Sequence, residues 1–266
     1  MGRRSRKNLI PARTPGELDA MQAAGEIVGR TLQAVRAAAK PGVSTMELDA
    51  LAEQTIRDAG AVPTFLGYGG FTGSICTSVN DVIVHGIPND QHILKDGDLV
   101  SIDCGATLDG WVGDSAWTFG IGELAENAQK LNDATAWILD QGIQAMQPGN
   151  RLTDISHAIE VATAAAEEKW DVDLFIVDGF GGHGIGRTMH EDPFLPNEGK
   201  ANRGPLIQEG STLAIEPLIT LGTEDNFVDA DDEWTVYTED GSWAAHWEHT
   251  VAATANGPRI LTPRSS

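Results

Sequence analysis

The sequence predicts one α/β domain composed of two related halves, because two segments of the first half reappear in the same order in the second. The segment PGVSTMELDALAEQ, from Pro41, resembles PGNRLTDISHAIEV, from Pro148, and each places a Pro-Gly break before a helix. LKDGDLVSID resembles IQEGSTLAIE, and each is a turn followed by an apolar strand that ends in a carboxylate. We therefore expect a duplication that places Asp103 and Glu216 in equivalent positions.

Helix and strand signals follow one another in a regular order. TPGE, from Thr14, is a capping box with proline at the first helical position, so a helix should begin there and end before Pro41. STME, from Ser44, predicts a second helix that ends near Gly60. The other expected elements are a β-rich stretch at 64–120, helices at 122–147 and 153–169, and alternating strands and turns at 173–255.

The composition is that of a globular protein with an unusual charge. The chain of 266 residues is 41% hydrophobic, but its net charge of −21 disfavours binding to DNA by bulk electrostatics. Eight acidic residues and no Lys or Arg lie in Glu224–Asp240, which we interpret as a solvated loop or edge. No secretory signal or apolar run of about 18 residues is present, and Cys76 and Cys104 form no CxxC motif. We expect a cytoplasmic protein without a membrane span.

Two carboxylates face the same side of a predicted hairpin. Asp103 ends an apolar run, and Asp109-Gly110 is a strong turn signal. A turn at 109–110 pairs Asp103 with Ala116 and leaves Asp114 diagonal to it, whereas a turn at 108–109 pairs the two aspartates directly. Either register puts both carboxylates on one face, where they repel each other. A bound cation is the simplest remedy, and two solvent-facing acids are the alternative.

Three further side chains could complete a metal site. Glu216 ends STLAIEP and Glu248 lies in AHWEHTVAAT, and a carboxylate after a buried strand is rare unless it is paired or metal-bound. His183, in GGHGIGR, adds an imidazole, and we interpret its glycines as clearance that lets it approach metals and substrate. The spacing is not the GxGxxG of a dinucleotide cradle, and HExxH is absent. Four carboxylates and one histidine would balance two divalent ions and suit Mn, Fe, Co or Zn.

From about residue 12 to 257 the chain resembles the type I methionine aminopeptidases. The resemblance rests on VNDVIVHGIP, LKDGDLVSIDCG, GWVGDSAWTF, GHGIGRTMHEDP, LAIEP and HWEHTV. It implies the α+β pita-bread fold, in which two pseudo-symmetric halves form an antiparallel sheet with flanking helices. The implied organisation is a basic segment at 1–11, a single catalytic domain at 12–257 and a tail at 258–266.

The resemblance also assigns roles to individual residues. Glu216 would accept a proton as well as bind metal, His85 would lie near the scissile amide nitrogen, and His190 would contact the substrate carbonyl. The implied ligands of two divalent ions are Asp103, Asp114, His183, Glu216 and Glu248. The implied walls of the methionine pocket are Phe65, Tyr68, Phe71, Cys76 and Trp234. Two departures affect that pocket: Met189 stands where phenylalanine is common, and Asn197 where an aromatic residue is usual.

The implied activity is removal of the initiator methionine from nascent polypeptides when the second residue is small. Met1-Gly2 fits this rule, so we expect the mature chain to start at Gly2. The basic stretch Arg3–Lys7 offers a contact to ribosomal RNA, with a solvated start as the simpler expectation, and we expect a monomer. Two alternatives are a proline-specific peptidase, for whose additional N-terminal domain there is no space before Asp103, and a binding module that has lost catalysis.

Overall fold

A computed structural model describes residues 10–264, so Gly2 and the stretch Arg3–Lys7 lie outside the described residues. Each helix predicted from the sequence is present. The α-helices are α1 (Pro15–Ala38), α2 (Thr45–Asp58), α3 (Glu126–Gln144) and α4 (Leu152–Trp170). A short 3-10 helix spans Tyr68–Gly70. Within the described residues, no helix is long and apolar enough to cross a membrane.

The strands form two larger and two smaller sheets, and every pairing is antiparallel. In the first half, β4 (Leu99–Leu108) pairs with β1 (Val62–Pro63), β2 (Ile75–Val79) and β5 (Trp111–Gly120). In the second half the order is β15 (Gly257–Ile260), β14 (His249–Thr254), β9 (Thr212–Ile215), β7 (Gly181–Gly184) and β8 (Glu191–Pro196). One smaller sheet has the order β13 (Ala244–His246), β10 (Leu218–Thr220) and β6 (Phe175–Ile176). The other has the order β11 (Asn226–Val228), β12 (Val236–Thr238) and β3 (Val82–Val84).

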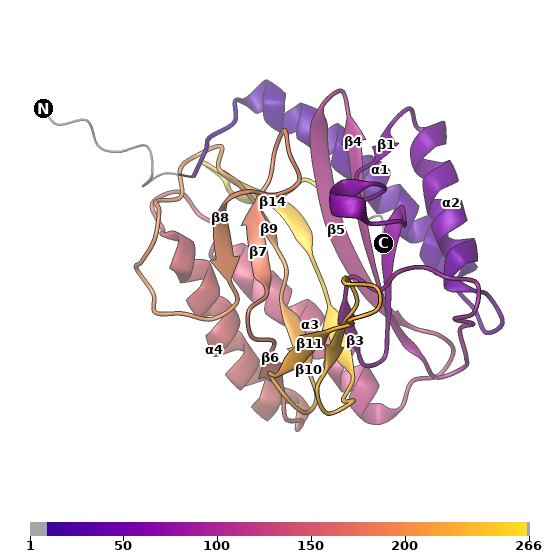
Figure 1. Ribbon diagram of the computed structural model, residues 1–266. Coiled ribbons are helices and arrows are strands. Elements are labelled where there is room, and N and C mark those ends of the chain that lie inside the picture. Colours follow the sequence, from indigo (N-terminus) through magenta and orange to yellow (C-terminus); the bar gives the residue numbers. More distant parts are fainter. Residues whose placement is uncertain (1–9, 265–266) are drawn as a thin grey trace, which may run out of the picture.

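A pair of helices packs against the larger sheet of each half, with α1 and α2 beside β4 and β5, and α3 and α4 on the side of β7 to β9 (Figure 1). The apolar face of α1 has helical spacing, which is why this face is buried. Its buried positions include Leu18, Met21, Gly25, Val28, Leu32 and Val35. Each half thus contains a helix pair followed by its strands, which confirms the predicted α+β fold of two related halves.

The β4–β5 hairpin has the first of the two registers considered from the sequence. Asp103 is the partner of Ala116, and Asp114 is the partner of Gly105. The turn residues Asp109 and Gly110 have φ angles of 50° and 74°, and two positive φ values are what a two-residue type I′ turn requires. Asp114 therefore lies diagonal to Asp103 on the same face of the hairpin.

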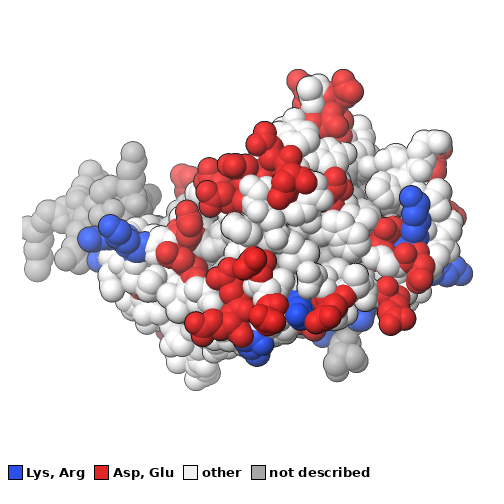
Figure 2. All heavy atoms as spheres, turned by 90° about the horizontal axis from the view of Figure 1, so that it is seen from below, with Lys and Arg blue, Asp and Glu red and all other residues white. Residues whose placement is uncertain are grey.

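The charge of the chain is visible on its surface. Acidic side chains outnumber basic ones on the face seen in Figure 2. The formal net charge of −21 is spread over a surface with few Lys and Arg residues to offset it. A surface of this sign repels a phosphate backbone, in agreement with the expectation that nucleic acid is not a bulk electrostatic partner.

A buried aspartate joins α2 to the start of β2. The Asp49 carboxylate accepts hydrogen bonds from the backbone N–H groups of Ser74 (2.7 Å) and Ile75 (3.0 Å), and burial raises the pKa of Asp49. We expect Asp49→Ala to lower the free energy of unfolding by about 2 kcal/mol or more, because two buried N–H groups lose their acceptor. Asp49→Asn keeps an acceptor oxygen and should cost less.

Urea unfolding of these variants checks the prediction, with Asp58→Ala, at the exposed end of the same helix, as the control. If Asp49→Ala and Asp58→Ala unfold at the same urea concentration, the two hydrogen bonds do not support the junction of α2 and β2.

Candidate metal centre

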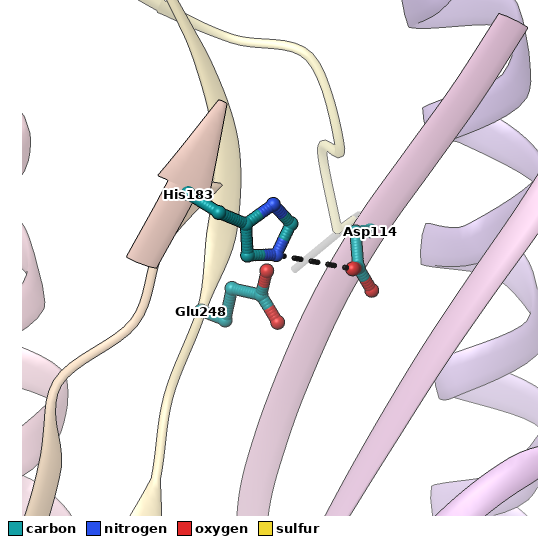
Figure 3. A group of neighbouring side chains, drawn as sticks. All are labelled: Asp114, His183 and Glu248. Carbon is teal, nitrogen blue, oxygen red and sulfur yellow. Dashed lines mark ion pairs between the residues drawn. The ribbon is translucent and has the colours of Figure 1, made fainter. Parts of the chain in front are cut away.

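Five side chains from distant parts of the chain meet between the two larger sheets. They come from β4 (Asp103), β5 (Asp114), β7 (His183), the residue after β9 (Glu216) and the residue before β14 (Glu248). Asp114, His183 and Glu248 point toward one another (Figure 3). Asp103 from the first half of the chain and Glu216 from the second half border the same cavity.

The spacing of these atoms fits a metal ion. His183 Nε2 lies 3.8 Å from Asp114 Oδ2 and 3.6 Å from Glu216 Oε1. The ligand atoms of Asp114, His183 and Glu248 all lie within 4.8 Å of one another. Donors that each bind one ion at about 2 Å are separated by roughly 3–4 Å. These three residues and Glu216 are therefore spaced as ligands of a small divalent ion.

Unpaired oxygen atoms point to the same conclusion. Asp103 Oδ1, Asp114 Oδ1 and Glu248 Oε1 are buried and accept no hydrogen bond from the described part of the chain. A buried polar atom without a partner costs free energy, and a buried carboxylate costs more. A divalent cation would satisfy all three oxygens, so the donor set fits the group that the sequence pattern implies.

The electrostatics of the site favour bound cations. Burial raises the pKa of Asp114 to about 7. Burial, followed by the charges of neighbouring carboxylates, raises the pKa values of Asp103, Glu216 and Glu248 well above their ordinary values. Without cations, these acids would hold protons that free carboxyl groups release. Positive charge at the site lets them ionise together.

His183 is prepared as a neutral ligand. Burial lowers its pKa to about 4, and neutral imidazole is the form that binds a metal. Its Nδ1 lies 2.9 Å from the carbonyl oxygen of Gly184, so Nδ1 carries the proton and Nε2 is left free toward the carboxylates. A hydrogen bond of this kind fixes the tautomer and the ring orientation of a ligand histidine.

The glycines around His183 serve a different purpose from the predicted one. A Cβ at Gly182 would lie 2.2 Å from the carbonyl oxygen of Ala214, and a Cβ at Gly184 would lie 2.4 Å from that of Asp192. The space that glycine leaves therefore faces the backbones of the neighbouring segments, not the metals and substrate. Close packing of these strands places His183 at the site.

The predicted substrate residues line one cavity with the metal-site residues. The cavity is bordered by Phe65, Tyr68, Phe71, Cys76, His85, Asp103, Asp114, His183, His190, Glu216, Trp234 and Glu248, together with Val84 and Met189. Phe71 and Trp234 pack edge to face, with ring centroids 5.2 Å apart. The Tyr68 hydroxyl lies 2.8 Å from Nδ1 of His190, and burial lowers the pKa of His85 to about 4. The sequence-predicted residues are thus brought together, and Val84 is an addition.

The two departures from the family pattern have different consequences. Met189 lines the cavity, as expected from its position beside His190. Asn197 does not border the cavity. It is buried, and its Nδ2 donates a 2.9 Å hydrogen bond to the carbonyl oxygen of Glu216. Asn197 is therefore not part of the pocket wall, and it instead holds the backbone of a predicted metal ligand.

Sequence reasoning missed one histidine at the centre. The sequence motifs assign no role to His246, but its Nε2 lies 3.4 Å from Glu216 Oε2 and 3.9 Å from Glu248 Oε2. Burial lowers the pKa of His246 to about 3, so the ring is neutral. The available signal was the spacing in HWE, because residues two apart in an extended segment share a face.

Comparison with known proteins identifies the family. Residues 19–255 match metallopeptidase family M24. Methionine aminopeptidase 1 of Mycobacterium tuberculosis is 59% identical over 256 residues, which cover 96% of each chain. The crystal structure of methionine aminopeptidase from Rickettsia prowazekii has a TM-score of 0.91 and 37% identity, over 96% of this chain and 100% of that one. Prolidase from Pyrococcus furiosus has a TM-score of 0.77 and 21% identity, over 98% of this chain and 67% of that one, which shows a shared fold alone. The chain therefore belongs to metallopeptidase family M24 and, within it, to the type I methionine aminopeptidases.

Proposed function

We propose that this enzyme releases the N-terminal methionine of polypeptides whose second residue is small, by hydrolysis that requires two divalent metal ions. The proposed ligands are Asp103, Asp114, His183, Glu216 and Glu248, and the ions are Mn, Fe, Co or Zn. The observation that carries the proposal is the meeting of three buried carboxylates, the partly buried Glu216 and a neutral imidazole in a cavity that also has aromatic and sulfur-containing walls. Membership of a metallopeptidase family supports the use of divalent metal.

Each side chain has a task in this reaction. Divalent ions at the site would lower the pKa of water and polarise the scissile carbonyl. Glu216 accepts the proton of the attacking water, and the neutral ring of His246 lies beside that carboxylate, with Nε2 3.4 Å from Glu216 Oε2. His190 contacts the substrate carbonyl, with its ring oriented by the hydroxyl of Tyr68. His85, neutral at pH 7, lies near the scissile amide nitrogen and can donate a hydrogen bond from its ring N–H, while the proton that Glu216 takes from water is available for the departing amine.

The cavity also accounts for the choice of substrate. Phe65, Phe71 and Cys76 are buried in its wall and are joined by Trp234 and Met189. Aromatic rings and sulfur atoms make favourable contacts with a flexible thioether, so this wall suits a methionine side chain. The free α-amino group of the substrate would bind near one of the two metal ions, which restricts the reaction to chain ends.

Release of free methionine from short peptides tests the proposal. We expect chelator-treated protein to be inactive and Mn²⁺ or Co²⁺ to restore turnover of Met-Gly-Met-Met. Met-Lys-Met-Met should be cleaved at least about 10-fold more slowly, because a single pocket contact changes kcat/KM by about 10–200-fold. N-acetyl-Met-Gly-Met-Met should not be cleaved.

Each alternative function has its own outcome in this assay. No methionine release with any divalent ion would favour a binding module, and faster cleavage of an Xaa-Pro peptide than of Met-Gly-Met-Met would favour a proline-specific peptidase. The proposal extends to nascent polypeptides as substrates in the cytoplasm and to a monomeric enzyme. Contact of Arg3–Lys7 with the ribosome stays a prediction.

A further inference from the structure

The chain beyond β15 is built into the domain. Leu261 and Thr262 are completely buried. The backbone N–H of Leu261 donates to the carbonyl oxygen of Thr250 (2.8 Å), and the backbone N–H of Thr250 donates to Thr262 Oγ1 (3.2 Å). Thr262 Oγ1 also lies 2.8 Å from Nδ1 of His249. Residues 261–264, which we call the C-terminal segment, therefore run along β14. This strand begins directly after Glu248 of the metal centre.

Two glycines of α1 make room for this segment. A Cβ at Gly25 would lie 2.0 Å from the carbonyl oxygen of Leu261, and a Cβ at Gly29 would lie 2.1 Å from that of Pro263. Residues four apart lie on the same face of a helix, so the two glycines form one continuous surface. The segment lies against this surface and enters the structure between α1 and β14.

Arg264, at the end of the C-terminal segment, reaches the two strands that carry metal-site residues. Its Nη2 donates hydrogen bonds to the carbonyl oxygens of Glu248 (2.6 Å) and Ala116 (2.8 Å), and to Ser115 Oγ (3.0 Å). Ser115 Oγ also donates to the carbonyl oxygen of Glu248 (2.6 Å), and the N–H of Glu248 donates to the carbonyl oxygen of Ala116 (3.0 Å). Arg264 thus closes a junction between β5 and the start of β14, directly beside Asp114 and Glu248.

Two tryptophans hold the guanidinium group in position. Its central carbon lies 5.1 Å from the ring centroid of Trp117 and 5.2 Å from that of Trp247. Arginine stacks on aromatic faces while its N–H groups stay free to donate. The charge of Arg264 also acts on the carboxylate of Glu248, where it opposes the repulsion from the other acids.

We propose that Arg264 is a positioning residue of the metal centre, which fixes Glu248 relative to Asp114. The inference rests on the proposed function, because it takes these two residues as ligands. They belong to different halves and different sheets, so their separation depends on the contacts between β5 and β14. These are the junction at Arg264 and the two hydrogen bonds that join Thr250 Oγ1 to the backbone of Asp114 (3.1 and 2.8 Å). Partners that orient metal ligands typically affect metal affinity by about 10–100-fold when mutated.

The test compares three replacements of Arg264 with a matched control. Arg264→Met removes the donors and the charge but can still pack between the tryptophans, and Arg264→Lys restores a charged donor. Arg264→Gln keeps an N–H₂ group without the charge. The control is Arg259→Met, which removes an arginine of β15 that pairs with Asp19 of α1 (2.8 Å). Calorimetric titration of the metal-free proteins with Mn²⁺ is followed by kcat and KM measurements with Met-Gly-Met-Met.

We expect Arg264→Met to bind Mn²⁺ about 10-fold more weakly or worse and to lose kcat with little change in KM. Arg264→Lys should recover most of the affinity, and Arg259→Met should match the wild type. If circular dichroism shows that Arg264→Met does not fold, Arg264→Gln becomes the deciding variant. We expect the same loss of Mn²⁺ affinity and of kcat for it.

Three results would overturn the inference. Wild-type Mn²⁺ affinity in the deciding variant would show that the junction does not set the ligand positions. An equal loss of Mn²⁺ affinity in Arg259→Met would show a general effect of destabilisation. No recovery of Mn²⁺ affinity in Arg264→Lys would show that a charged donor at this position is not what fixes the ligands. A wild-type protein that binds no metal would instead refute the proposed function itself, together with this inference.

Discussion

Glu216→Gln is expected to lower kcat by about 10³-fold, because the amide cannot accept a proton from water and no longer brings negative charge to the metal centre. The size of the side chain is nearly unchanged, so the packing around β9 should be kept. Rates of methionine release from Met-Gly-Met-Met at saturating Mn²⁺ measure the effect. Glu209→Gln, an exposed glutamate seven residues earlier, is the matched control and should be as active as the wild type.

The position of His246 sharpens this experiment. Its buried Nε2 forms no hydrogen bond with the described part of the chain and lies 3.4 Å from Glu216 Oε2, so the amide of the variant meets the same neutral ring as the carboxylate does. A Glu216→Gln variant that keeps kcat within about threefold of the wild type would remove Glu216 from the chemistry.

The stability of the metal-free protein is expected to fall as pH rises, and divalent metal should reverse the fall. Burial raises the pKa of Asp114 from about 4 to about 7, so the folded state binds more protons than the unfolded state between these values. Stability decreases with pH wherever the folded state binds more protons, at most by about 1.4 kcal/mol per pH unit for one such group. Mn²⁺ at 100 times its dissociation constant should stabilise the protein by about 2.7 kcal/mol.

Urea unfolding at pH 5 and pH 7.5, with and without Mn²⁺, measures these effects. Asp114→Asn serves as the comparison, because the amide does not titrate and the variant should show a smaller decrease in stability between the two pH values. An equal decrease in the two metal-free proteins would mean that Asp114 does not carry the effect. Identical stability with and without Mn²⁺ at pH 7.5 would contradict the assignment of the site.

Much of the fold could be predicted because its signals are local. The capping boxes at Thr14 and Ser44 define the starts of α1 and α2 by hydrogen bonds within four residues. The hairpin places Asp103 and Asp114 on one face in either register, so the shared face was predictable while the choice of turn was not. The structure has the register with the turn at Asp109-Gly110.

Features that depend on distant packing could not be predicted in the same way. A sequence does not show which backbone will lie against Gly182, so its missing Cβ suggests space for substrate when it is space for a neighbouring strand. His246 reaches Glu216 only because β13 and β10 pair. Arg264 reaches Glu248 only because the glycines of α1 admit the C-terminal segment. Such contacts arise from three or more segments that come together in the folded chain.

The identity of the metal centre is tested most directly by anomalous X-ray scattering from crystals of this protein soaked in Mn²⁺. The account predicts two anomalous peaks among the five side chains, each with oxygen or nitrogen atoms of those residues at bonding distance. Asp103, Asp114, His183, Glu216 and Glu248 should all contribute ligand atoms. A fully soaked crystal with no peak in this cavity, or with ions bound only elsewhere on the acidic surface, would contradict it.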